Sequence, residues 1–224
     1  MTTELFSLLK NSNLNDEKFI EFFKIIENQI TKGISLINNV GKLSLLDEGK
    51  ISLKPMSVSN VLREALPFAE KSVFNKILDI KVEELQENLS VMANEFLLDV
   101  FENILHNAIK HNQNKYILIK INISKTLHNE RNYIKLEFSD NGIGVSDIRK
   151  PNVFQKNKPK VYNTKSMGIG LSLVNKIIET YDGKIWVENR IKEDHSQGSN
   201  FVILIPEYSP KISIKKTAVF LKPR

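Results

Sequence analysis

The sequence predicts an α+β fold, a two-layer sandwich of helices on a sheet, with one long helix ahead of it. Before residue 50, apolar residues recur at the helical spacing of three and four. After residue 50, segments that alternate apolar and polar residues, as strands do, are interspersed with segments of helical periodicity. At least two of these strands follow one another directly along the chain, which is typical of an α+β sandwich.

The composition excludes several classes of function. A length of 224 residues suits one domain, or one domain with a helical appendage. The absence of cysteine excludes disulfides, a cysteine-ligated metal site and a thiol nucleophile. No apolar run approaches the roughly 18 residues that a membrane span needs, and the N-terminus lacks the pattern of a signal peptide. We therefore expect a cytoplasmic protein and no membrane segment in this chain.

The net charge of +6 is concentrated in two segments. The tail, residues 211–224, carries five basic residues and no acid, and the segment 149–165 carries six basic residues and no acid. Each could be a solvated stretch of chain. We predict no nucleic-acid binding, because Phe220 is the only aromatic residue among the cations of the tail.

A long amphipathic helix is predicted over residues 16–46. Asn15 can cap it, and Asp16 and Glu17 lie in its first turn, where the helix dipole favours acids. Its apolar stripe comprises Phe19, Phe23, Ile26, Ile30, Ile34, Ile37 and Val40. Such a stripe usually packs against another helix, either in the same chain or in a partner.

The remaining elements divide the chain into three parts. Helices are predicted at 55–74, 93–112 and 170–181, and strands at 77–82, 116–124, 133–139, 184–188 and 201–205. We expect a helical segment over residues 1–50, the main domain over 51–210 and the basic tail over 211–224.

One polar face on the helix 93–112 stands out. Asn103 and Asn107 are four residues apart and Lys110 follows three later, so the three side chains share a face. Carboxamide oxygens are hard ligands suited to Mg²⁺, and a lysine beside them suits a phosphate. Taken alone, this pattern also fits a solvated helix face.

Two glycine-containing segments follow. Asp140-Asn-Gly142-Ile-Gly144 comes directly after a strand, where Asp140 could accept a hydrogen bond from an exocyclic amine such as that of adenine. Gly168-Ile-Gly170-Leu171 opens a helix, whose first amides could bind a phosphate. Neither segment is a dinucleotide-binding fingerprint or a Walker loop, and each could be an ordinary turn.

Together, in this order, the three segments closely resemble the ATP-binding catalytic domain of sensor histidine kinases, a domain type shared with gyrase-type, Hsp90-type and MutL-type ATPases. The resemblance covers roughly residues 81–208. It implies an ATP site made of Asn103, Asn107, Lys110, His111, Asp140, Gly142, Gly144, Phe154, Lys165, Gly168, Gly170 and Leu171.

The resemblance also implies a role for each position. Asn107 and Asn103 would hold Mg²⁺, Lys110 would contact phosphate, and His111 would lie against the nucleotide. Asp140 would bind the adenine amino group, in a pocket shaped by Gly142 and Gly144. Gly168, Gly170 and Leu171 would anchor one end of a basic lid, residues 149–165, which contains Phe154 and Lys165. Phosphoryl transfer depends mainly on positioning and charge neutralisation, which this set of residues can supply.

The histidine that such kinases phosphorylate is missing from the expected place. In the family it lies on the first of two hairpin helices ahead of the ATP-binding domain, but no histidine of this chain precedes His106. The helix 16–46 resembles the second hairpin helix. The phosphoryl group would therefore go to a histidine that is not in this chain, and the chain alone is not expected to phosphorylate itself. A truncated kinase and a natural relative without kinase activity both fit.

The resemblance implies two protein partners, a second copy bound through helix 16–46 and the receiver domain of a response regulator. Two other functions fit parts of this pattern. An ATP-binding regulatory or scaffold module without kinase activity is the alternative. A gyrase-like or chaperone-like ATPase is disfavoured, because Glu102, the nearest candidate base, points about 100° away from its neighbour Asn103 on the helix.

Overall fold

The computed structural model describes residues 16–49, 51–73, 75–83, 89–155 and 169–210. The chain divides into two compact units, Met1–Lys50 and Ile51–Arg224. In the first unit, helix α2 spans Asp16–Asp47, within one residue of the range that periodicity predicts. Across the described residues, no helix combines the length and apolar character that crossing a bilayer requires.

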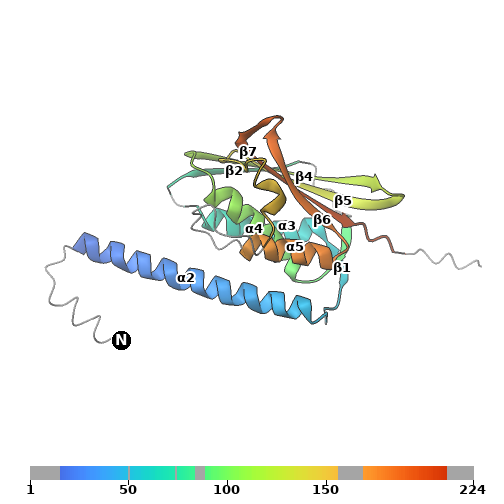
Figure 1. The fold of residues 1–224 in the computed structure, drawn as a ribbon, viewed down its shortest axis with the longest axis horizontal. Coiled ribbons are helices and arrows are strands. Elements are labelled where there is room, and N and C mark those ends of the chain that lie inside the picture. The colour runs from blue at the N-terminus through green and yellow to red at the C-terminus, as the bar shows by residue number, and fades with distance from the viewer. Residues whose placement is uncertain (1–15, 50, 74, 84–88, 156–168, 211–224) are drawn as a thin grey trace, which may run out of the picture. The chain divides into compact units, whose positions relative to one another are not determined.

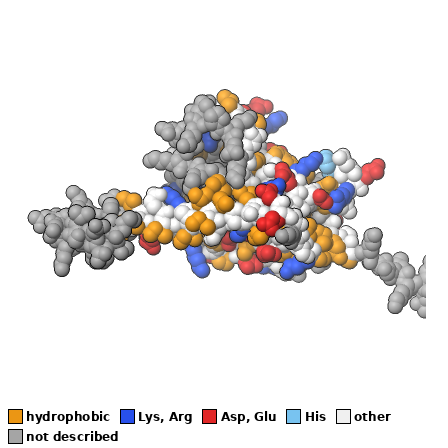
Figure 2. All heavy atoms as spheres, turned by 60° about the horizontal axis from the view of Figure 1, so that its bottom comes forward, with side chains coloured by type: hydrophobic (Ala, Val, Ile, Leu, Met, Phe, Trp, Pro, Cys, Tyr) orange, Lys and Arg blue, Asp and Glu red, His pale blue; other side chains and the backbone are white. Residues whose placement is uncertain are grey.

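Much of the predicted apolar stripe on α2 is exposed. Ile37 is 71% exposed and Ile30 is 58% exposed, and Phe23, Ile34 and Val40 are also exposed. Figure 2, in which the lower side of Figure 1 comes forward, shows hydrophobic side chains at the surface of that side. The side chain of Phe19 lies outside the described residues. An exposed row of large apolar side chains is the kind of surface that a partner helix covers.

The second unit is built on a five-stranded sheet with the strand order β2-β4-β5-β7-β6. The strands are β2 (Ile77–Glu83), β4 (Tyr116–His128), β5 (Arg131–Asp140), β6 (Lys184–Ile191) and β7 (Asp194–Pro206). β2 and β4 are parallel, and every other neighbouring pair is antiparallel. Helices α3 (Val58–Lys71), α4 (Phe96–Lys110) and α5 (Ile169–Thr180) lie on one face of this sheet (Figure 1). The predicted two-layer α+β sandwich is confirmed.

The core forms between the helices and the alternating apolar residues of the central strands. Ile117, Ile119 and Ile121 of β4 are fully buried, whereas Lys120 between them is exposed. This alternation places one face of the strand against the helices and the other in solvent. The rings of Phe101 on α4 and Phe138 on β5 lie 5.6 Å apart, so α4 packs directly on the central strand.

The sequence patterns missed a small second sheet, in which β1 (Lys54–Ser57) pairs antiparallel with β3 (Ser90–Ala93). Helix α3 therefore begins at Val58 rather than 55, and the side chain of Ser57 caps it by accepting a hydrogen bond from the Asn60 amide. Helix α4 likewise begins at Phe96 rather than 93, because Ala93 belongs to β3.

A buried polar pair joins the start of α4 to the residue that follows α5. The hydroxyl of Tyr181 donates to the side-chain oxygen of Asn94, and the Asn94 amide donates back to the hydroxyl over 3.5 Å. Both residues are only 3% exposed. The same Asn94 oxygen accepts from the Phe96 amide, as a cap does at a helix N-terminus.

Candidate functional site

The candidate site lies at the end of the sheet where β5 ends and β7 begins. Asp140, the last residue of β5, is only 5% exposed. Its Oδ1 atom accepts hydrogen bonds from the amides of Gly142, over 2.7 Å, and Ser199, over 3.5 Å. Within the described residues, no hydrogen bond reaches its second oxygen, Oδ2. One oxygen is therefore held by the backbone while the other can accept a hydrogen bond from a ligand.

Burial also sets the charge state of this carboxyl. It raises the pKa of Asp140 to about 6, against the opposing effects of the Gly142 and Ser199 amides and of the nearby Arg190 charge. Asp140 is therefore mostly ionised at neutral pH and becomes protonated in mildly acidic solution. A buried carboxylate with a raised pKa at the end of a strand is typical of a functional site.

The turn after Asp140 packs against the C-terminal end of α4. The Ile143 amide donates to the carbonyl oxygen of His111 over 3.1 Å. A β-carbon at Gly142 would lie 2.8 Å from that carbonyl oxygen and 2.8 Å from Oδ1 of Asp140. The structure thus brings together Asp140, Gly142 and His111, which belong to two separate sequence segments.

The same turn also fits closely against the β6–β7 hairpin. Gly144 has a φ of +67°, and a β-carbon there would overlap the carbonyl oxygen of His195 at 1.6 Å. Only glycine fits this combination of backbone angle and close approach. The turn is therefore fixed on two sides, by α4 and by the hairpin.

The polar face of α4 leads from this turn toward α5. Asn103 donates from Nδ2 to the carbonyl oxygen of Asp99 over 2.8 Å, and its Oδ1 faces Gly170 in the first turn of α5. Asn107 follows Asn103 by one helical turn and is half-buried, and Lys110 follows at the end of the helix and is exposed. Leu171, next to Gly170, is half-buried.

Positive charge gathers around the end of α4. The pKa of His111 is lowered by burial first, and then by the charges of Lys110 and Arg149. The pKa of His106 is lowered by burial and by its neighbours Lys110 and His111. Both imidazoles are therefore largely neutral at pH 7, while Lys110 and Arg149 supply the positive charge. This electrostatic environment favours an anion.

The donor set fits a magnesium nucleotide better than a metal held by protein carboxylates. In the parts of the chain that the structure describes, no group of three or more histidine or acidic side chains could hold a metal ion. The carboxamides of Asn103 and Asn107 offer hard oxygen ligands, but they carry no charge. Mg²⁺ would need phosphate oxygens from a ligand to complete its coordination, as it commonly does in nucleotide sites.

The start of the basic segment 149–165 is fixed to the sheet. Lys150 binds both Asp147 and the side-chain oxygen of Asn189 on β6, each over 2.5 Å. The ring of Phe154 meets that of Phe201 on β7 edge to face, with 6.2 Å between centroids. Lys165 and Gly168, which the resemblance assigns to the site, lie outside the described residues.

Two asparagines that the sequence patterns did not single out hold the site together. Asn112 donates from its side chain to Oδ1 of Asn141 over 2.7 Å, and the Leu118 amide donates to the same oxygen over 2.8 Å. The Asn141 amide group in turn donates to the carbonyl oxygen of Tyr116 over 3.0 Å. The amide-rich run that follows α4, Asn112-Gln-Asn114, is the signal that could have indicated this role.

Comparison with known proteins agrees with this geometry. Residues 92–209 match the family described as histidine kinase-, DNA gyrase B- and HSP90-like ATPases. The adaptive-response sensory kinase SasA of Synechocystis sp. is 27% identical over 189 residues, which cover 83% of this chain and 46% of that protein. The circadian input-output histidine kinase CikA of Synechococcus elongatus is 26% identical over 201 residues, covering 85% of this chain and 25% of CikA. The chain thus spans less than half the length of these curated relatives.

Solved structures show the same fold. The catalytic domain of histidine kinase ThkA is 25% identical, with a TM-score of 0.59, over 70% of this chain and 99% of that domain. Histidine kinase ThkA in complex with the response regulator protein TrrA is 20% identical, with a TM-score of 0.66, over 92% of this chain and 56% of that chain.

Proposed function

Because the chain belongs to the family of histidine kinase-, DNA gyrase B- and HSP90-like ATPases, we propose that residues 51–210 are the ATP-binding catalytic domain of a two-component sensor histidine kinase. The observation that carries this proposal is the environment of Asp140. Its carboxylate is buried, with Oδ1 bound by backbone amides and Oδ2 open to a ligand. A carboxylate oxygen held in this way can accept a hydrogen bond from the exocyclic amine of adenine and thereby select the base.

The phosphates of ATP would extend from this pocket along α4. Asn103 and Asn107 would hold Mg²⁺ together with phosphate oxygens, and Lys110 would contact a phosphate. The bound magnesium nucleotide supplies the γ-phosphoryl group. The chain's own residues orient the phosphates and balance their negative charge, which is most of what phosphoryl transfer requires.

The acceptor in this proposal is a histidine outside the chain, since the four histidines all lie at or after His106. The relatives are named sensory or histidine kinases, and one solved neighbour is a complex of a histidine kinase with a response regulator protein. We therefore propose a receiver domain as a protein partner and homodimerisation through α2. Use of ATP would place the domain in the cytoplasm.

Calorimetric titration with ATP, with and without Mg²⁺, tests nucleotide binding. Asp140→Asn keeps the size of the side chain but replaces one acceptor oxygen with a donor group. We expect its ATP affinity to fall by about 10-fold to 100-fold, the loss of one hydrogen bond to a charged group. Asp182→Asn makes the same change at an exposed position beyond α5 and should bind ATP like the parent. Equal binding by the parent and Asp140→Asn, or no binding by either, would refute the assignment.

A transfer assay separates a kinase from a regulatory module. A separate helical hairpin that carries a histidine is added with radiolabelled ATP, and label on the hairpin is measured. We expect transfer by the parent, strong loss with Asn107→Ala and no label on the chain itself. Phosphohistidine at His128 or His195 would contradict the proposed acceptor. ATP binding without any transfer would favour the regulatory module.

A further inference from the structure

A cavity of about 660 Å³ lies on the other side of the turn that follows Asp140. Its lining includes Lys115 and Tyr116 at the start of β4, Asn141 and Gly142 in the turn, and Arg190 and Gln197 from the β6–β7 hairpin. Asp140 and the polar face of α4 do not line it. The cavity is therefore a separate space from the proposed nucleotide site, although Gly142 borders both.

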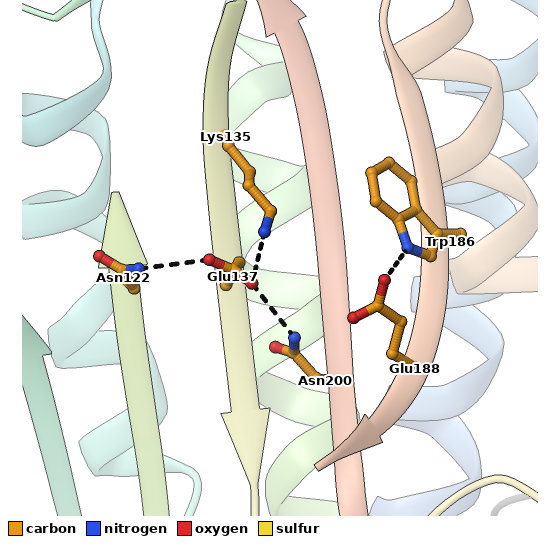
Figure 3. A network of polar contacts seen from close by, with 6 residues as sticks. All are labelled: Asn122, Lys135, Glu137, Trp186, Glu188 and Asn200. Carbon is orange, nitrogen blue, oxygen red and sulfur yellow. Dashed lines mark hydrogen bonds and ion pairs between the residues drawn. The ribbon is translucent and has the colours of Figure 1, made fainter. Parts of the chain in front are cut away.

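Strand alternation explains why the two spaces face opposite ways. Asp140 pairs in register with Ile119, which is fully buried against the helices, so its side chain faces the helical layer. Asn141, the next residue, turns to the other side and bonds to the backbone of Tyr116 and Leu118. Figure 3 shows the outer face of the sheet with the side chains of Trp186 and Glu188 on β6. Arg190 follows Glu188 by two residues along the same strand, where the β6–β7 pairing becomes irregular between Asn189 and Ile191, and it lines the cavity.

The cavity carries two positive charges without a matching negative charge. No acidic residue lines it. Considering only the described residues, neither Lys115 nor Arg190 has a carboxylate oxygen within 4.0 Å. Two lysines elsewhere in the sheet are paired: Lys135 lies 2.8 Å from Glu137 (Figure 3), and Lys81 lies 3.6 Å from Asp79. Lys115, just ahead of β4, and Arg190, on β6, have no ion pair in the described part of the chain, and amide groups that can donate lie beside them. This is a suitable environment for an oxyanion.

The turn couples this cavity to Asp140. Gly142 lines the cavity, and its amide donates to Oδ1 of Asp140 over 2.7 Å. The positive charge of Arg190 acts across the same turn and helps to keep Asp140 ionised. An anion bound to Arg190 would offset that charge and would contact the segment that positions the Asp140 carboxylate.

We propose that this cavity is a second binding site, for a small anion with phosphate or carboxylate oxygens, and that its occupation weakens binding at the Asp140 site. Lys115 and Arg190 bind the anion, and Gln197 adds a side-chain amide. Anion binding is independent of the function proposed above. The effect of the bound anion on ATP affinity rests on the proposed ATP-binding function.

Calorimetry in the presence of a chelator and without Mg²⁺ tests the first part, with inorganic pyrophosphate and citrate as separate probes. We expect at least one of them to bind the parent, and their relative affinities to show whether phosphate or carboxylate is preferred. The double variant Lys115→Gln/Arg190→Gln should bind about tenfold or more weakly, as expected when charged hydrogen bonds are lost. The control Lys120→Gln/Lys184→Gln removes the same charge from two exposed outer-face lysines and should bind like the parent.

Three results would overturn the site. The first is that the parent binds neither probe, and the second is that the control loses as much affinity as Lys115→Gln/Arg190→Gln. The third is that Lys110→Gln abolishes binding while Lys115→Gln/Arg190→Gln retains it, which would place the anion in the nucleotide's phosphate site.

ATP affinity measured at a pH near 6 with a saturating probe tests the coupling. The dissociation constant for ATP should rise several-fold in the parent and should not change in Lys115→Gln/Arg190→Gln. Anion binding with no effect on ATP affinity would overturn the regulatory part. If the parent bound no ATP at all, the proposed function would fail, while the anion titrations would still decide the second site.

Discussion

Gly170 lies so close to Asn103 that a β-carbon at position 170 would be 2.5 Å from the Asn103 side-chain oxygen. The first turn of α5 is thus in direct contact with the polar face of α4. The oxygen of Asn103 is fixed from two directions, since its amide group is bonded to the Asp99 carbonyl. A proposed magnesium ligand therefore depends on the absence of a side chain on another helix.

Substitution of Gly170 by alanine should displace Asn103. The added methyl group cannot fit at 2.5 Å, so either the Asn103 side chain rotates or α5 shifts. We expect ATP affinity in the presence of Mg²⁺ to fall by about tenfold, because the Asn103 oxygen would no longer be placed to contact the charged Mg²⁺. Gly33→Ala is the control, because no heavy atom lies within 4 Å of the added methyl group. Unchanged Mg²⁺-dependent affinity in Gly170→Ala would show that Asn103 is not a ligand.

ATP binding should depend on pH through Asp140. The pKa of this carboxyl is raised to about 6, so the acceptor form predominates above that pH and is lost below it. We expect ATP affinity to fall as the pH drops from 7 to 5, and the Asp140→Asn variant to lack this dependence. Titrations at a series of pH values measure both. A parent profile that stays flat through pH 6 would contradict the role of Asp140.

Protonation of the Asp140 carboxyl should stabilise the fold, although it weakens ATP binding. Because its pKa in the folded protein is higher than 3.8, the folded state binds the proton more tightly than the unfolded state. Its stabilising contribution is present below about pH 4 and is lost as the pH rises through 6, by up to about 3 kcal/mol. Relative to the parent, Asp140→Asn should therefore gain stability between pH 4 and 7. Urea denaturation at each pH measures this difference.

Removing the hydroxyl of Tyr181 should destabilise the second unit. Tyr181→Phe leaves the buried Asn94 without this partner, at a cost of about 1–2 kcal/mol. Tyr133→Phe is the matched control, because the Tyr133 hydroxyl makes no hydrogen bond among the described residues. Thermal denaturation of both variants measures the effect, and equal losses would show that the Asn94 pair contributes little.

The exposed stripe on α2 should mediate self-association. Ile30 is 58% exposed and Ile37 is 71% exposed. The double variant Ile30→Glu/Ile37→Glu should leave the helix intact but disrupt apolar contact with a second copy. Light scattering should give the mass of a dimer for the parent and of a monomer for the double variant. Ser35→Glu, also at an exposed position on α2, controls for the added charge. A parent mass of one chain would contradict homodimerisation.

The sequence predicts the helices and strands whose apolar residues recur at a regular spacing. It misses the strands that form only by pairing with a segment far along the chain. Helix α2 and the positions of the five long strands follow from apolar spacing, although β7 begins at Asp194 rather than at 201, because residues 194–200 lack the apolar alternation of a strand. The β1–β3 sheet does not, because four residues around Pro55 show too little alternation, and their partner strand lies more than 30 residues away. The aspartate, the asparagines and the glycines of the candidate site could be recognised as a pattern. The contacts of Gly144 with His195, and of Asn112 with Asn141, arise only in the folded chain.

The position of β5 in the middle of the sheet determines how the candidate site responds to local unfolding. β5 is hydrogen-bonded to β4 on one side and β7 on the other, so neither edge of the strand is free to fray. Its backbone amides should exchange with deuterium only when the whole unit unfolds, whereas edge strands β2 and β6 should exchange sooner. Asp140, at the end of this strand, should thus belong to a segment that opens late, so a ligand would meet a preformed carboxylate rather than one that must first become ordered.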